Sequence, residues 1–239
     1  MDIPAEKLVV GNGVSELIRL LNVHYVKKAS MAIPTFNEYE STLKPTEIEY
    51  FDTGPNNFVL NAEAYVQSVK DSDSNTALII NPNNPTSIFE PKEKIKWILH
   101  SLKDLEMVIV DESFLDFVVH KDQYRSFFSV DDLLDEYPNL ILIRSLSKEF
   151  GVPGLRLGYI ASANEALVQQ MRKYCPIWNI NSLAEAFLEI LPRYQSDYVD
   201  SLELIRRDRD SLYEKILPVP YLNVYKPAAN YVFAQVQGG

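Results

Sequence analysis

The chain has 239 residues, 46% of them hydrophobic and 23% charged, and 33 Asp and Glu against 23 Lys and Arg give it a net charge of −10. This acidic balance disfavours nucleic acid and anionic lipid as partners, because binding to either depends on Lys and Arg that neutralise phosphates. The single cysteine, Cys175, excludes an internal disulfide and a cysteine-based zinc site. With no long apolar run, no signal-peptide pattern and no histidine pair at metal spacing, the sequence predicts a cytoplasmic protein without a membrane span or a metal.

Short apolar runs alternate with amphipathic segments along most of the chain. We expect strands at residues 8–10, 28–33, 48–51, 76–80, 107–110, 140–143 and 156–160. We expect helices from residue 14, from about residue 37, and over residues 61–69, 92–105 and 164–213, before two last strands at 219–225 and 231–236. This alternation predicts an α/β fold with a mostly parallel sheet that is flanked by helices on both faces.

Ligands of open α/β sheets bind at the carboxyl ends of the strands, so polar segments that follow strands are candidate sites. Residues 11–16, GNGVSE, open a helix and offer free backbone N–H groups that suit a phosphate. The alternative is an ordinary glycine turn. Residues 81–86, NPNNPT, contain two Asn-Pro pairs that favour extended backbone. Three asparagines in such a rigid segment could hydrogen-bond an oxygen of a ligand. The alternative is a plain loop.

Two further segments carry charged side chains after buried strands. The strand at 107–110 ends in Asp111 and Glu112, but a nucleotide hydrolase would also need a GxxxxGK[ST] loop, which the sequence lacks. Asp111 could instead bind a protonated ring nitrogen. Residues 145–158 place Lys148 near residues with small hydroxyl side chains, which suits a Schiff-base amine. The same segment contains Arg156, whose planar guanidinium could bind a phosphate with two hydrogen bonds. The alternative is a solvated lysine and a surface salt bridge.

Together the four segments resemble the fold type I pyridoxal-phosphate (PLP) enzymes, and within them the class I and II aminotransferases. The nearest branch contains histidinol-phosphate aminotransferase and threonine-phosphate decarboxylase. Residues 81–86 match NPNNPT, residues 111–117 match DEAYxxF with two changes, and residues 145–158 match SxSKxxxxxGLRxG. Residues 179–184 resemble the NVNSLA segment of the same branch, so the resemblance covers essentially the whole chain.

The resemblance implies PLP as cofactor and a role for each matching residue. Lys148 would form the Schiff base and later move the Cα proton, and Asp111 would pair with the pyridinium nitrogen. Asn84 would donate to the phenolic oxygen, and Phe36 would stack on the ring, with Tyr39 near it in a packing or a direct role. The cofactor phosphate would be held by backbone amides, hydroxyls and a guanidinium, those of Val14, Ser15, Ser145, Ser147 and Arg156.

Two residues depart from the family pattern. Phe114 stands where these enzymes usually carry a tyrosine that donates to the phenolic oxygen, which leaves Asn84 as the main donor to that oxygen. Ser87 replaces the glycine that usually follows NPNNPT. Three other features lie outside the motifs: we expect Trp178 in the core or in a pocket wall, the acidic run at 131–136 on a solvated helix face, and His24, His100 and His120 in structural or solvated places.

The resemblance also implies a domain division and an assembly. Residues 1–190 would form the large cofactor-binding domain, and residues 191–239 a linker helix and the start of a small C-terminal α/β domain. The sequence contains neither the segment that normally gates the substrate nor the arginine that normally binds its carboxylate, so we expect a fragment, a shortened chain or a degenerate gene product. A homodimer with each site near the interface is implied as well.

The implied activity is amino-group transfer between an L-amino acid and a 2-oxo acid, with histidinol-phosphate-like amino substrates included. One alternative is α-decarboxylation of the threonine-phosphate decarboxylase type, because that branch shares most of these motifs. Another is a truncated, inactive homologue that acts as a binding protein.

Overall fold

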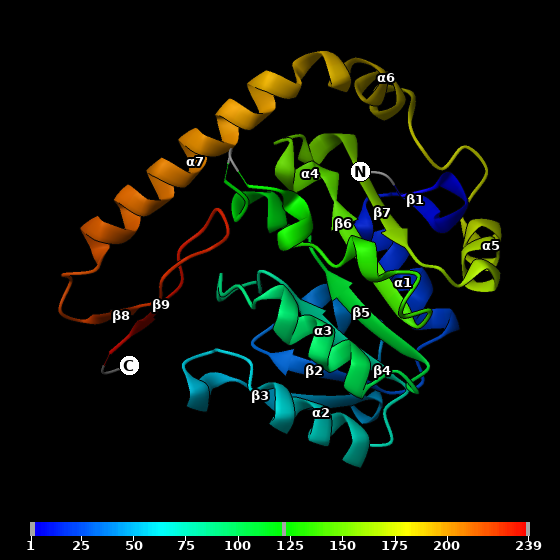
Figure 1. Ribbon diagram of the computed structural model, residues 1–239, viewed down its shortest axis with the longest axis horizontal. Coiled ribbons are helices and arrows are strands. Elements are labelled where there is room, and N and C mark those ends of the chain that lie inside the picture. Colours follow the sequence, from blue (N-terminus) through cyan, green and yellow to red (C-terminus); the bar gives the residue numbers. More distant parts are fainter. Residues whose placement is uncertain (1–2, 121–122, 238–239) are drawn as a thin grey trace.

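A computed structural model describes residues 3–120 and 123–237 (Figure 1). Its centre is a seven-stranded sheet with the strand order β1-β7-β6-β5-β4-β2-β3. The strands are β1 (Leu8–Asn12), β2 (Ala29–Ile33), β3 (Ile48–Asp52), β4 (Thr76–Ile80), β5 (Met107–Asp111), β6 (Leu140–Ser145) and β7 (Leu157–Ala161). All pairs from β3 to β6 are parallel, and only β7 runs against its two neighbours, β6 and β1. The predicted mostly parallel α/β sheet is confirmed.

Helices cover both faces of the sheet, because successive side chains of a strand point to opposite faces. Val108 and Val110 pack with α2 (Ala62–Asp71) and α3 (Lys92–Ser101). Ile109, between them, packs on the other face with α1 (Val14–His24) and α5 (Glu165–Tyr174). All residues of β4, β5, β6 and β7 are buried, which explains why their sequences are nearly continuous apolar runs.

Two of the predicted helices differ from the structure. The helix expected from about residue 37 is only a 3-10 turn, Asn37–Tyr39. Asn22 Nδ2 donates to the Tyr39 carbonyl at 2.7 Å and so takes the acceptor that a continuing helix would use. The stretch expected at 164–213 is divided into α5, α6 (Ser182–Ile190) and α7 (Gln195–Ile216). Cys175 is extended before Pro176, and the Asn181 side chain caps a new helix by accepting from Ala184 N.

Two expectations about side chains are also corrected. Trp178 is 94% exposed, so it lies neither in the core nor in a pocket wall of this chain. The acidic run is not a helix face but a 3-10 turn, Asp131–Leu133, with its continuation. Its exposed carboxylates form ion pairs with lysines of distant segments: Asp132 with Lys92, Asp135 with Lys7 and Glu136 with Lys96.

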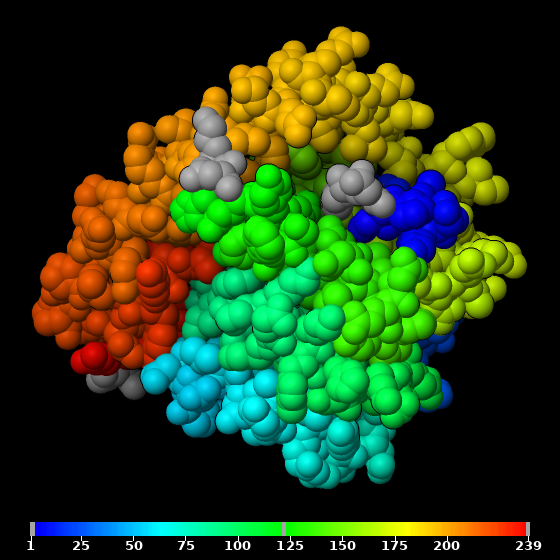
Figure 2. Space-filling model, viewed as in Figure 1, coloured from blue at the N-terminus to red at the C-terminus, as the bar shows by residue number. Residues whose placement is uncertain are grey.

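The C-terminal third is more open than the sheet. Helix α7 runs along the outside of the body in Figure 1, and only Leu202 and Arg206 of it are buried. It leads to β8 (Leu222–Val224) and β9 (Ala234–Val236), an antiparallel pair shorter than the strands predicted there. In Figure 2 this part, orange to red, lies against the edge of the body. The domain boundary near residue 190 stays a prediction. No helix within the described residues is long and apolar enough to cross a membrane.

Candidate active site

The candidate site is a cavity at the edge of the sheet where β1, β2, β4, β5 and β6 end and the reversed strand β7 begins. Each of these strands contributes through the residues that adjoin it, as expected for an open α/β sheet. The cavity is lined by Val14, Ser15, Phe36, Ile80, Asn84, Asp111, Ser113, Phe114, Ser145, Lys148 and Arg156. Of the eleven residues that the sequence placed at or near the cofactor, nine line this cavity; Ser147 and Tyr39 are the exceptions.

One end of the cavity is formed by the start of α1 beside Arg156. Gly13 caps this helix with φ +85 and no side-chain hydrogen bond, and Val14 and Ser15, the first residues of the helix, line the cavity. A Cβ on Gly158 would lie 2.8 Å from the backbone nitrogen of Val14, so this position requires glycine for the close approach. A Cβ on Gly13 would meet the Arg156 guanidinium, and the φ of +85 also favours glycine there. Helix amides and a guanidinium together make a site for an anion such as phosphate.

Asp111, the last residue of β5, is buried at the centre of the site. Its Oδ2 accepts from the Tyr39 hydroxyl at 2.6 Å, and its Oδ1 accepts from the Ser113 amide at 2.8 Å. Burial raises the pKa of Asp111, and these hydrogen bonds and the charge of Arg144 oppose that rise. Burial, and then the charge of Asp111, raise the pKa of Tyr39. Tyr39 is thus a neutral donor that orients the carboxylate, and its ring packs edge-on against Phe36 with centroids 6.5 Å apart.

Lys148 lies on α4 (Leu146–Glu149), a single turn that follows β6. It is exposed to the cavity, whereas its neighbours Ser147 and Glu149 are buried. The Ser147 hydroxyl lies 3.3 Å from both the nitrogen and the oxygen of Leu157, so it fastens α4 to β7 instead of lining the cavity. The amine is therefore carried on a turn that is anchored on both sides.

Asn84 and Phe36 enter from two loops that are joined by Asn83. The Asn83 side chain donates to the Pro34 carbonyl at 3.0 Å and to Thr86 Oγ1 at 2.9 Å. These bonds hold the loop of Asn84 against the loop of Phe36.

Phe114 lines the cavity and packs edge-on against Tyr231, with ring centroids 5.1 Å apart. Sequence reasoning missed two lining residues, Ile80 and Ser113. Ile80 could have been found as the last residue of its strand. The Ser113 hydroxyl accepts from the Ser145 amide at 3.0 Å and so joins the ends of β5 and β6; its position within the DEAYxxF match was the available signal.

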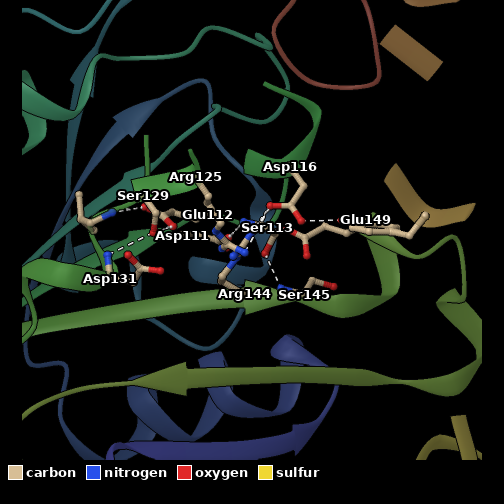
Figure 3. Close-up of polar contacts among 12 residues, drawn as sticks. Asp111, Glu112, Ser113, Asp116, Arg125, Ser129, Asp131, Arg144, Ser145 and Glu149 are labelled. Atoms are coloured by element: carbon tan, nitrogen blue, oxygen red, sulfur yellow. Dashed lines mark hydrogen bonds and ion pairs between the residues drawn. The ribbon is translucent and has the colours of Figure 1, made fainter. Parts of the chain in front are cut away.

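A cluster of buried charges lies around Arg144 of β6 and Glu149 of α4 (Figure 3). Arg144, fully buried, forms ion pairs with Asp116 at 2.8 Å and with Glu149. Glu112 accepts from the Ser129 hydroxyl at 2.7 Å and from the Val130 amide at 2.8 Å. Burial raises the pKa of Glu112 to about 7, although Arg144 and these bonds favour its charged form. Tyr198 of α7 donates to Asp116 at 2.5 Å, so the cluster connects the sheet to the C-terminal helix.

The residues around the cavity fit an aromatic ring that bears a phosphate and an aldehyde. The α1 amides and Arg156 match the phosphate, the buried Asp111 carboxylate matches a protonated ring nitrogen, and Phe36 provides an apolar wall. Lys148 offers the amine that condenses with a carbonyl. Within residues 3–120 and 123–237, no group of three or more His, Cys, Asp or Glu side chains could hold a metal ion.

Fold and site together define an α/β protein whose ligand cavity lies at the carboxyl edge of a mostly parallel sheet. A family model, Aminotransferase class I and II, matches residues 2–237. The chain belongs to this family, as the motifs predicted. Other matches include histidinol-phosphate aminotransferases and a threonine-phosphate decarboxylase, the branch that the motifs resemble, and solved structures of this fold hold PLP.

Similar proteins differ in their named activities. The chain is 34% identical over 234 residues to a CMP-5'-(3-aminopropyl)phosphonate synthase of Streptomyces rubellomurinus, covering 98% of this chain and 36% of that protein. It is 32% identical over 244 residues to an L-serine phosphate decarboxylase of Campylobacter jejuni, covering 99% and 62%. A solved decarboxylase from Sulfurospirillum multivorans superposes with a TM-score of 0.87 at 30% identity, over 98% of this chain and 67% of that one. The chain thus spans less than two thirds of the Streptomyces and Campylobacter proteins.

Proposed function

We propose that the cavity binds PLP and that Lys148 is the residue that attaches it. The observation that carries this proposal is the convergence of a lysine amine, a buried carboxylate and an anion cradle on one cavity. Bound PLP supplies a protonated pyridine ring that acts as an electron sink. All other tasks fall to side chains and amides of this chain.

Each proposed task follows from a group's surroundings. Arg156 and the first amides of α1 bind the phosphate, and Asp111, oriented by Tyr39, holds a proton on the ring nitrogen. Phe36 confines the ring from one side, while Asn84 donates to its phenolic oxygen. Lys148, which lines the cavity, would also hold or move a proton at the substrate Cα through its amine.

We propose α-decarboxylation of a phosphate-bearing L-amino acid as the reaction. The support is similarity at 30% identity or above to proteins named as decarboxylases, one of them of L-serine phosphate. Phe114 agrees with a departure from standard transamination, because the phenolic oxygen then lacks its usual tyrosine donor. Amino-group transfer, the activity favoured by the motifs, remains the second candidate, and the matching family model is its support.

A half-reaction experiment separates the two candidates. Purified protein loaded with PLP is mixed with L-serine O-phosphate, L-threonine O-phosphate or L-histidinol phosphate, without a 2-oxo acid. We expect CO₂ from a phosphorylated amino acid and no accumulation of pyridoxamine phosphate. Pyridoxamine phosphate without CO₂, above all from histidinol phosphate, which has no carboxylate to lose, would establish amino-group transfer instead. A loaded protein that turns over none of the three would support the binding-protein alternative.

We also propose that two copies of the chain associate as a homodimer. The support is a group of exposed apolar side chains between α5 and α6 and on α6: Ile177 is 86% exposed, Trp178 94% and Leu183 72%. Such a group is unusual on a monomer. Sedimentation at increasing concentration is expected to give a dimer that Trp178→Asp weakens; a monomer at all concentrations would contradict the proposal. The cytoplasmic location stays a prediction.

A further inference from the structure

The loop that carries Asn84 is bonded to a segment that follows more than 140 positions later in the chain. Ser87, fully buried, accepts through Oγ from the Ala229 amide at 2.8 Å and from the Ala228 amide at 3.1 Å. Its carbonyl also accepts from the Ala228 amide at 2.8 Å. Ser87 has φ +62, a conformation that favours glycine. Glycine is usual at this position, yet serine adopts the same backbone conformation here. The hydrogen bonds from the Ala228 and Ala229 amides to its hydroxyl hold Ser87 in that conformation.

Tyr231 makes the second connection between the same segments. Its hydroxyl donates to the Asn83 carbonyl at 2.9 Å, while its ring packs on Phe114. Burial raises the pKa of Tyr231, and the negative charge of Asp111 raises it further. The phenol is therefore protonated throughout the neutral range and remains a donor.

The connected segments are themselves anchored. On one side, Arg209 of α7 donates to the Ala228 carbonyl at 2.7 Å and to the Phe117 carbonyl at 3.3 Å. On the other, the Asn83 side chain holds the carbonyl of Pro34, next to the loop of Phe36. An unbroken series of bonds thus runs from α7 through residues 228–231 to the two loops that enter the cavity.

We propose that Ser87 and Tyr231 are positioning residues of the cofactor site, which fix the loop of Asn84 so that its side chain can donate to the cofactor phenolic oxygen. The inference rests on the proposed function and extends the site to a segment that lines none of the cavity. Because Phe114 supplies no donor, the geometry of Asn84 decides the strength of the remaining hydrogen bond. The usual tyrosine would donate to the phenolic oxygen directly. In this chain Tyr231, which packs on Phe114, instead orients the side-chain amide of Asn84 that donates to that oxygen.

The test measures the pH midpoint at which the absorbance band of protein-bound PLP titrates. Tyr231→Phe keeps the ring on Phe114 and removes only the bond to Asn83, so donation by Asn84 weakens and the midpoint rises by roughly half a unit to one unit. The matched control is Tyr225→Phe in the same C-terminal part. The Tyr225 hydroxyl accepts from Asn223 and donates to Gln235, so this variant also loses tyrosine hydrogen bonds, but none to the loop of Asn84. The control midpoint is expected to equal that of the unmodified protein.

Ser87→Gly provides an independent variant, since glycine adopts the same φ and only the hydroxyl is lost. It is expected to raise the midpoint in the same direction. In the protein without PLP, both variants are expected to exchange the amide hydrogens of Asn83 and Ser87 roughly five- to tenfold faster than Tyr225→Phe does. This second readout does not depend on the cofactor.

The possible results distinguish a failure of the positioning role from a failure of the proposed PLP binding. Equal midpoints in the unmodified protein and in both Tyr231→Phe and Ser87→Gly would overturn the positioning role and leave the proposed function intact. Absence of a PLP band in the unmodified, folded protein would overturn the proposed function itself. A variant that lowers stability without moving the midpoint would count as structural only, which also contradicts the inference.

Discussion

The sheet and the C-terminal third of this chain are stabilised in different ways. Four adjacent strands, β4 to β7, have no exposed residue, whereas α7 buries only two side chains along its 22 residues. The sheet is maintained by apolar burial on both faces. The C-terminal third is attached through one small apolar cluster, in which Leu202 and Ala229 pack against Phe114 and Phe117, and through specific polar contacts. Arg206 and Arg209, for example, donate to the carbonyls of Asp116 and Ala228.

This difference indicates a division of tasks. Apolar burial is non-directional and tolerates small shifts, so it suits a rigid support for residues at strand ends. Hydrogen bonds between specific groups fix an orientation, and in this chain they join the C-terminal third to the loop of Asn84. The two regions meet at Phe114, which packs on Tyr231 from one side and lines the cavity on the other.

The largest expected effect contrasts one apolar residue from each region. Ile109→Ala, in the middle of β5, is expected to lower the free energy of unfolding by about 2–5 kcal/mol, since it leaves a cavity in the sheet core. Leu204→Ala on α7, at a side chain that is 50% exposed, is expected to change it by less than about 0.5 kcal/mol. Urea unfolding measures both. Comparable losses would mean that the half-exposed side chains of α7 contribute as much to stability as the sheet core does.

Glu112 provides a pH test of the buried charges between the regions. Burial raises its pKa from the usual 4.5 to about 7 in the folded state. Between these values the folded protein binds more protons than the unfolded chain, so this contribution to stability is present below pH 4.5 and is lost as pH rises through 7. Glu112→Gln, which can still accept from Val130 and donate to Ser129, should remove this loss.

The measurement is urea unfolding at pH 5 and pH 8 for both proteins. The decrease in unfolding free energy between these pH values should be smaller in Glu112→Gln by roughly 2–3 kcal/mol. A Glu112→Gln profile parallel to that of the unmodified protein would show that Glu112 is already ionised at pH 5.

Much of the site could be predicted because its residues follow strands in recognisable motifs. Asp111, Lys148 and Asn84 each lie within a few residues of a strand end, and parallel strands bring those ends to one edge. The connection of Tyr231 to Asn83 could not be predicted, because it depends on how distant segments pack. Trp178 was misplaced for a related reason: its apolar character indicates burial without specifying what covers it.

Phe114, where the two regions meet, permits a smaller and sharper test. Phe114→Tyr would add a donor near the cofactor phenolic oxygen, and a hydrogen bond to a charged group is worth about 1.5–3 kcal/mol. The pH midpoint of the bound-PLP band is expected to fall by roughly one to two units. Phe117→Tyr, the same change in a buried ring that does not line the cavity, should leave the midpoint unchanged while lowering stability. A midpoint that Phe114→Tyr does not move would show that this ring is too far from the cofactor.

The central claim is that Lys148 carries the cofactor, and chemical labelling tests it most directly. The purified protein is incubated with PLP, reduced with borohydride, digested and analysed by mass spectrometry, with Lys148→Arg treated in parallel. We predict one phosphopyridoxyl group per chain on Lys148 and none in Lys148→Arg. A label on another lysine, or equal labelling of Lys148→Arg, would contradict the account.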